Sequence, residues 1–206
     1  MTLRLNGSNS GFTEVKAPAT AGSNTITLPT SNGSANQYLA NGSTAGELTY
    51  VTPPGSFTSY AIICDEKAHG TSGGTATSGA WRTRDLNTEI ADPDGIVSIS
   101  SNQFTLGAGS YLIEASAPAY SINRHQVRIY NATSSSVVQY GENAFCNNST
   151  NVHNRSAVTA RVTITGSTAF ELQHRFETNG TTNGLGIENS FGGTSIYATV
   201  KIYKEA

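Results

Sequence analysis

Charged side chains are scarce in this sequence. Asp, Glu, Lys and Arg make up 13% of its 206 residues, well below the roughly 25% that is usual for soluble domains. The net charge is −2, so the chain lacks the basic surface with which proteins bind nucleic-acid backbones. Gly, Ser, Thr and Asn take the place of charged residues. This composition is typical of a turn-rich β protein with an uncharged polar surface.

Long apolar runs are also missing. The N-terminal stretch MTLRLNGSNS has no apolar core of the length that a signal peptide needs, and no later run could span a bilayer. We therefore expect the chain to be made in the cytosol. The Asn-X-Ser/Thr triplets at Asn6 and Asn131 are then products of composition and not glycosylation sites.

Only two cysteines are present, Cys64 and Cys146, and neither belongs to a metal-ligand spacing. We expect two buried free thiols that pack as small hydrophobic side chains. A disulfide bond between them stays open, because a pairing cannot be derived from sequence.

Motifs for catalysis and cofactors are lacking. The chain contains no nucleophile elbow, no phosphate loop with its lysine and no histidine pair at metal-ligand spacing. Asp65 and Glu66 are neighbours, so on a strand they would point to opposite faces and could not act together. We expect structural or solvated roles for them and for Asp85 and Glu89. The prediction is a protein that is not an enzyme and needs no cofactor.

The segment DPDG at residues 92–95 offers the acids of half a calcium loop. Its proline and glycine positions also fit a type I turn, which is the interpretation that we favour. A bound calcium ion stays open as the alternative.

The sequence changes character at VTPPGSF, residues 51–57, where paired prolines and a glycine exclude a central strand. We place a domain boundary here, between residues 1–55 and 56–206. In the first part we expect short strands at LRL, FTEVKAP, NTITLP, QYLA and ELTYV. Its apolar residues are too few to close a core, so we expect copies of the chain to bury them around an axis. These residues are Leu3, Leu5, Val15, Ile26, Leu28 and Leu39.

Residues 56–206 show many strand signals and no helical period. We expect strands at SYAIIC, GIVSIS, QFTL, SYLIEASAPAY, HQVRIYNA, SVVQYGENAF, SAVTARVTIT, TAFELQHRFE and TSIYATVKIYK. So many strands separated by turns predict an all-β sandwich or jelly roll. In the last segment, apolar residues at even positions from Ile196 to Ile202 alternate with Tyr197 and Tyr203. The tyrosines are therefore expected on the outer face, where an oligomer could bury them.

The segment QFTLGAGSYLIEASAPAY resembles the signature of the tumour-necrosis-factor and complement globular-head superfamily. There, a strand led by an aromatic residue reaches a glycine corner and continues as Gly-x-Tyr-x-Ile/Phe. STAFELQHRF is similar to the penultimate strand of that family, and NGLGIENSFGGTSIYATVKIYK to its closing strand, with Ala198 where the family often has Gly. The signature positions are Phe104, Gly107, Gly109, Tyr111 and Ile113.

The resemblance implies a ten-stranded jelly roll that assembles as a compact homotrimer. The first and last strands of the domain would lie toward the three-fold axis. The trimer interface would then include Tyr60, Ile62, Tyr197 and Tyr203.

The segment SGFTEVKAPATAGSNTITLPTSNGSANQYLANGSTAGELTYV resembles one that recurs in tail-fibre and other structural proteins of tailed bacteriophages. The matching landmarks are Ser10-Gly11, Ala17 to Thr25, Leu28-Pro29, Gln37 to Leu39, and Tyr50. This resemblance implies an extended, β-rich trimeric stem that attaches to other virion proteins.

Two long loops, FCNNSTNVHNRS and TNGTTNGLGIENSFGG, are rich in Asn and Thr. Long loops on a rigid sandwich are where binding residues gather, and neutral donors and acceptors suit saccharide hydroxyls. The same residues would also serve as turns that merely solvate a surface. The candidate receptor-binding residues are Asn147, Asn148, His153, Asn154, Arg155, Asn183 and Asn189.

Together these features predict a structural virion protein of a tailed bacteriophage. It would be a short trimeric fibre or knob on the tail or the capsid, exposed on the particle, that recognises a host surface glycan or protein by avidity. A secreted or cell-surface trimeric TNF-like ligand or lectin-like module is the alternative. A hydrolase of surface glycans is a third reading, and we expect neither nucleic acid nor a membrane as partner.

Overall fold

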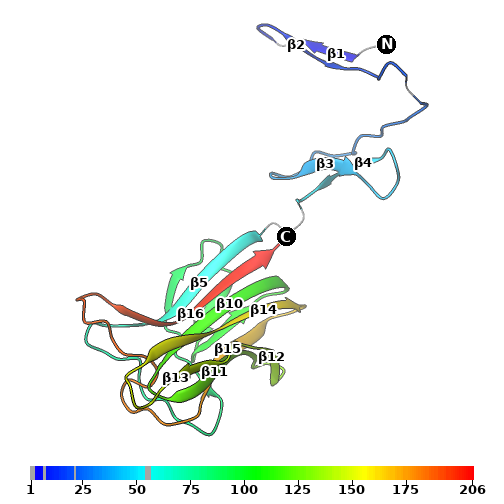
Figure 1. Ribbon diagram of the computed structural model, residues 1–206. Coiled ribbons are helices and arrows are strands. Elements are labelled where there is room, and N and C mark those ends of the chain that lie inside the picture. Colours follow the sequence, from blue (N-terminus) through cyan, green and yellow to red (C-terminus); the bar gives the residue numbers. More distant parts are fainter. Residues whose placement is uncertain (1–2, 7, 21, 54–56) are drawn as a thin grey trace. The chain divides into compact units, whose positions relative to one another are not determined.

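The computed structural model describes residues 3–6, 8–20, 22–53 and 57–206 (Figure 1). The chain divides into two compact units, Met1–Pro54 and Gly55–Ala206. The boundary that the sequence predicts, between residues 55 and 56, lies outside the described residues. No helix within the described ranges is long and apolar enough to cross a membrane.

Two short antiparallel hairpins form the first unit. Strand β1 (Leu3–Asn6) pairs with β2 (Phe12–Val15), and β3 (Tyr38–Asn41) pairs with β4 (Leu48–Val51). The strand predicted at NTITLP does not form, and a single parallel bridge joins Thr27 of this segment to Glu47.

The apolar side chains of the first unit are exposed. Their exposed fractions run from 45% at Leu39 to 69% at Leu28. Among the residues described in this unit, no hydrophobic side chain is buried. The unit therefore closes no core of its own, as its sparse apolar residues predict. The exposed side chains are Leu3, Leu5, Phe12, Val15, Ile26, Leu28, Tyr38 and Leu39.

Two antiparallel sheets form the second unit. One has the strand order β14 (His153–Ile164), β10 (Gly109–Tyr120), β16 (Ser195–Glu205), β5 (Phe57–Lys67), β7 (Thr88–Ala91). The other has the order β12 (Ser136–Tyr140), β11 (Asn123–Asn131), β15 (Thr168–Phe176), β9 (Gln103–Leu106), β8 (Val97–Ser100). Two short strands extend this second sheet: β13 (Ala144–Cys146) pairs with β11, and β6 (Arg82–Thr83) pairs with β15.

The chain repeatedly changes sheet along its course. It crosses between the sheets from β9 to β10, β10 to β11, β13 to β14, β14 to β15 and β15 to β16. These crossings give the layered connectivity of a jelly roll, and the two layers are visible in Figure 1. The predicted all-β sandwich is confirmed, with the short β6 and β13 added to ten longer strands.

Alternate residues of both sheets fill one core between the layers. In β10, Tyr111, Ile113, Ala115 and Ala117 point inward and are at most 5% exposed. They meet the inner face of the other sheet, where the rings of Phe104 and Phe170 stack with centroids 5.6 Å apart. Burying each large side chain contributes on the order of 1.5–3 kcal/mol. The other large core residues are Ile63, Leu106, Val127, Ile129, Leu172, Val200 and Ile202.

The glycine corner of the signature joins the two sheets. Strand β9 ends at Leu106 in one sheet, and β10 begins at Gly109 in the other. The Tyr111 hydroxyl donates a hydrogen bond to the Gly107 carbonyl oxygen, at 3.1 Å. Gly109 has φ = +152°, and an added Cβ would lie 3.2 Å from the Tyr111 ring. The tyrosine thus fixes the corner, and the glycine leaves room for it.

A β-bulge changes the face on which Tyr197 lies. The pairing of β16 with β5 shifts between Ile196 and Thr199, so one extra residue of β16 enters the ladder. Tyr197 is consequently 2% exposed and Ile196 is 50% exposed. The predicted alternation holds from Ala198 onward but is reversed at the start of the strand, because a simple two-residue period cannot include a bulge.

The segment SVVQYGENAF, predicted as one strand, is divided at Gly141 into β12 and β13. At Gly141 the chain approaches β14 so closely that an added Cβ would lie 2.4 Å from the Ala157 carbonyl oxygen. Strands β6 and β7 were not predicted, because β6 holds only two residues and neither strand shows apolar alternation.

Candidate binding surfaces

The outer face of the five-stranded sheet carries side chains in three cross-strand rows. The first row is large and partly aromatic, the second mixes charged and apolar residues, and the third is small. In register, the first row is Arg161, Leu112, Tyr203, Tyr60, and the second is Thr159, Glu114, Lys201, Ile62. The third row is Ala157, Ser116, Thr199, Cys64.

This face is aromatic at one end and hollow at the other. Tyr60 is 45% exposed, and the ring of Phe57 packs on that of Tyr203 with centroids 5.1 Å apart. The small third row leaves a hollow of about 400 Å³ beside Glu114 and Lys201. The surface thus has both apolar area and relief.

Three of the four predicted interface residues share this outer face, namely Tyr60, Ile62 and Tyr203. Tyr197 does not share it, because it is buried within the protomer and its hydroxyl donates to the Thr71 carbonyl oxygen at 2.7 Å. Its assignment to an interface was wrong, since a side chain with 2% exposure presents no surface to a partner.

Two of the predicted receptor-binding residues make internal contacts. Asn154 donates from Nδ2 to the Phe145 carbonyl oxygen at 2.7 Å, and its Oδ1 lies 2.7 Å from His125 Nε2. Arg155 donates to the Tyr197 carbonyl oxygen at 2.7 Å and to the Ser116 hydroxyl, and burial lowers the pKa of its guanidinium. Both residues therefore hold strands together.

The other predicted residues lie in loops, except His153, which is the first residue of β14. Asn147, Asn148, His153 and Asn189 are exposed or half-buried. The Asn148 amide donates to Asn123 Oδ1 at 3.1 Å, which ties this loop to the start of β11. Asn183 accepts a bond from the Gly186 amide at 2.9 Å and so shapes its own loop.

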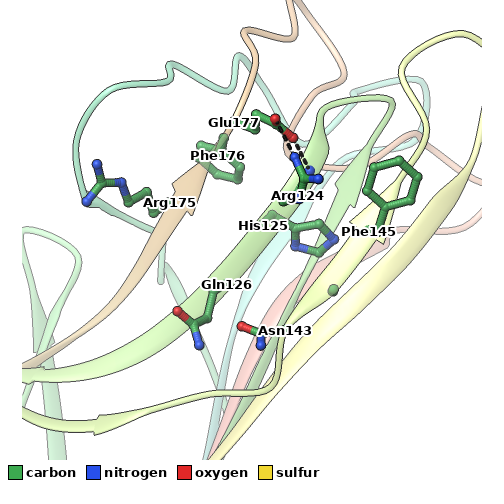
Figure 2. A pocket seen from close by; sticks show the side chains of 9 residues that line it. Arg124, His125, Gln126, Asn143, Phe145, Arg175, Phe176 and Glu177 are labelled. Atoms are coloured by element: carbon green, nitrogen blue, oxygen red, sulfur yellow. Dashed lines mark hydrogen bonds and ion pairs between the residues drawn. The ribbon is translucent and has the colours of Figure 1, made fainter.

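An open hollow of about 680 Å³ lies beside these loops. It is lined by the start of β11, by β13 with the residue before it, and by the end of β15. Its lining includes Phe145, which begins one of the two predicted binding loops, and four residues that the sequence did not indicate, namely Arg124, Gln126, Asn143 and Arg175 (Figure 2). Such a volume is within the range of small-molecule sites, roughly 300–1,000 Å³. The only sequence signal was polar alternation in NRHQVRIY and LQHRFE, which places these side chains on the outer face of the strands.

The charges in this hollow are unequal. Arg124 pairs with Glu177 at 2.7 Å, and its backbone amide also donates to that carboxylate at 3.1 Å. Arg175 is exposed, and among the described residues no carboxylate forms an ion pair with it. The nearby Arg128 is held by Gln173 and lies over the Trp81 ring, 4.2 Å from its centroid. Arg175 is therefore the arginine of the hollow that is available to pair with an anionic ligand.

Two buried histidines contact each other at the hollow, where His125 is part of the lining. His125 Nδ1 and His174 Nε2 are 2.9 Å apart, and the side chains are 4% and 0% exposed. Burial lowers the pKa of His125 and lowers that of His174 well below its usual value, with the nearby Arg84 charge acting in the same direction. Burial also lowers the pKa of Arg84 to about 10, and its guanidinium donates to the carbonyl oxygens of Pro118 and Leu185.

The acids that could suggest catalysis make structural contacts. Asp65 is buried with Oδ1 3.0 Å from Lys67 Nζ, and Lys67 also pairs with Asp85 at 3.0 Å. Burial raises the pKa of Asp65. Within the described ranges, no group of three His, Cys, Asp or Glu side chains is placed to hold a metal ion.

The DPDG segment forms a turn around Asp92. The Asp92 carboxylate accepts hydrogen bonds from the amides of Ile96 and Val97, both at 2.9 Å, and Gly95 has φ = +63°. Both carboxylate oxygens thus serve the turn, which confirms the turn interpretation.

Both cysteines are buried free thiols. Burial raises the pKa of Cys64 and of Cys146, so both thiols stay protonated at neutral pH. The expectation of small packed thiols is confirmed.

Comparisons with known proteins concern the fold. The sequence matches no protein-family model, and no curated protein matches it. Similar solved structures include the globular domain of zebrafish complement 1qA protein, with 16% identity, 71% of this chain and 96% of that chain covered, and a TM-score of 0.45. Eiger TNF from S. frugiperda has 10% identity, coverages of 73% and 94%, and a TM-score of 0.47. PRD1 vertex protein P5 has 13% identity, coverages of 74% and 100%, and a TM-score of 0.45.

Proposed function

We propose that the chain is a structural protein of a tailed-bacteriophage particle that assembles as a trimeric fibre or knob. The observation that carries this proposal is the exposure of eight large apolar side chains in a first unit without a core. Large apolar side chains exposed in such number favour a surface that another protein chain covers. Copies of the chain around an axis would bury these residues, so folding of this unit depends on assembly.

The outer face of the five-stranded sheet supplies a second surface for self-association. Its aromatic row contains Tyr60 and Tyr203, and aromatic residues are enriched at protein interfaces. The small row beside it leaves the hollow of about 400 Å³, into which a neighbouring copy can pack. A heterologous contact of this kind closes into a ring when three copies complete the rotation.

The phage location rests on the resemblance of residues 10–50 to segments of phage structural proteins. In this proposal residues 1–55 attach the protein to the particle, and residues 56–206 form the knob. Three knob domains in one trimer, and several trimers on one particle, turn weak contacts with a host surface into strong attachment by avidity. We infer attachment without turnover, because Asp65 and Asp85 are engaged with Lys67.

Gold-labelled antibody against the protein tests the particle role directly. We expect label at tail or capsid of intact particles in electron micrographs, and we expect purified protein to slow adsorption of the particles to host cells. Particles that carry no label and lack the protein on gels would contradict the proposal. A turnover assay on host surface polysaccharide separates attachment from hydrolysis, and release of reducing sugar would contradict the non-enzymatic part.

A further inference from the structure

We propose that the hollow at Arg175 binds a carboxylated saccharide, a sugar unit of the uronic-acid type. This inference deepens the proposed recognition role and rests on it. It moves the expected contact from the tips of the predicted loops to the outer face of the sheet beside them.

The hollow offers an apolar wall of the kind that sugars use. Phe145 is 52% exposed although it lies in a strand, and its register partner is Arg124 of β11. The exposed ring can stack on the C–H face of a pyranose, because aromatic side chains combine apolar area with little conformational freedom. The carbonyl oxygen of Phe145 accepts a hydrogen bond from Asn154, and Asn154 is in turn bound to the buried His125. These contacts fix the strand that carries the ring.

The polar groups around this wall fit sugar hydroxyls. Gln126 donates from Nε2 to the Gly141 carbonyl oxygen at 2.8 Å, which holds its amide in place and leaves its oxygen for a ligand hydroxyl. Asn143 lines the same hollow and is exposed. Figure 2 shows the Gln126 and Asn143 amides and the Phe145 ring as parts of this lining. Side-chain amides offer both donors and acceptors, as hydroxyl groups require.

The charge of the hollow selects an acid over a neutral sugar. Two arginines and one glutamate line it, so its net charge is +1 although the whole chain carries −2. Glu177 neutralises Arg124. Arg175 then offers its planar guanidinium to a ligand, and this group binds a carboxylate through two parallel hydrogen bonds. Arg175 is held in β15 by pairing with Gln126 of β11, so the cation lies opposite an amide that can bind the same sugar.

Calorimetric titration of the full chain with tri-galacturonic acid, and with its fully methyl-esterified counterpart, tests the site. The ester keeps the sugar and removes the negative charge. We expect the acid to bind at least about tenfold more tightly than the ester, a ratio that corresponds to roughly 1.4 kcal/mol. We also expect its affinity to fall as salt is raised.

Variants locate the binding. Arg175→Gln is expected to weaken binding of the acid about tenfold and to leave binding of the ester unchanged, and Phe145→Ala to weaken both ligands severalfold. Lys16→Gln, which removes an exposed cation from the first unit, is the matched control and should change neither. Because Arg175 and Phe145 are exposed, their variants are expected to keep the wild-type Tm, which confirms that they fold.

Equal affinity for acid and ester, an unchanged affinity in Arg175→Gln, or no heat of binding up to about 10 mM acid would each overturn the assignment. The particle role fails by a different result. If the antibody labels particles but the protein does not bind the acid, only the saccharide site is refuted. If the protein binds the acid but is absent from particles, only the particle role is refuted.

Discussion

Mild acid should destabilise the second unit through its buried histidine pair. The imidazoles of His125 and His174 are 2.9 Å apart and almost fully buried. One ring donates a hydrogen bond to the other. If both rings were protonated, two N–H groups would face each other. Arg84 and Arg155 add positive charge nearby, and His153 lies on the His125 side. The folded protein therefore holds the pair in a less protonated state than the unfolded chain does.

The sign and size of the effect follow from linkage. The pKa of each imidazole is lowered in the fold, so below about pH 6.5 the unfolded chain binds more protons than the folded one and stability falls. For a histidine that stays neutral in the fold, the free energy of unfolding decreases by about 1.2 kcal/mol between pH 7.0 and 5.5. We expect a loss of about 1.2 kcal/mol from His174 alone and up to about 2.4 kcal/mol from both. The raised pKa of Asp65 acts in the opposite direction at lower pH, so the comparison stops at pH 5.5.

Urea unfolding at a fixed protomer concentration, followed by the fluorescence of the single tryptophan, Trp81, measures the loss. In parallel, the imidazole C–H resonances of the folded protein are followed by NMR from pH 7.5 to 5. We expect His174 to stay unprotonated across this range. A stability that does not change between pH 7.0 and 5.5, or a His174 resonance that titrates near pH 6.5, would refute the reasoning. The NMR result decides even where variants of the pair do not fold.

Three further predictions concern packing and assembly. Gly141→Ala places a Cβ 2.4 Å from a backbone carbonyl oxygen and should lower the free energy of unfolding by about 2 kcal/mol. The control Gly166→Ala, whose Cβ would have no atom within 4 Å, should change it by less than about 0.5 kcal/mol. Equal urea midpoints for the two variants would contradict the close approach at Gly141. Tyr197→Phe removes the donor of a 2.7 Å hydrogen bond and should cost about 1 kcal/mol, and an unchanged midpoint would show that the hydroxyl is solvated instead. Tyr203→Lys should weaken the assembly, so that it dissociates at a higher protomer concentration in sedimentation experiments, while Tyr140→Lys, on the other sheet and 51% exposed, should leave it intact. A Tyr203→Lys variant that assembles as tightly as the wild type would remove the sheet face from the interface.

Residue patterns were enough to predict the sheets and the core. All nine strand segments expected in residues 56–206 contain strands of the structure, because inward apolar residues such as Tyr111 and Ile113 recur with period two. The glycine corner could also be located, because Gly107 and Gly109 separate two such patterns. The strand prediction was less accurate where the alternation of apolar and polar residues is locally broken. The bulge in β16 and the strand break at Gly141 both depend on a contact with a neighbouring strand, and no local sequence carries that information.

The candidate sites were less predictable than the fold. Asn154 and Arg155 were predicted in a polar loop, but the structure places them in β14 and uses them to bond Phe145, His125 and Tyr197. Polar composition does not distinguish a solvated loop from the start of a strand whose side chains bond neighbouring strands. The hollow at Arg175 needs residues from β11, β13 and β15, and only the pairing of these strands brings them together.

The mass of the full chain in solution tests the central claim, that copies of this protein bury one another's exposed apolar residues. Each chain has a mass of 21.6 kDa. Sedimentation equilibrium at micromolar concentration is expected to give three times that value, about 65 kDa, with no monomer at the lowest concentration measured. A mass of one chain with both units folded would contradict the account, because Leu3, Leu28 and Tyr60 would then stay in water.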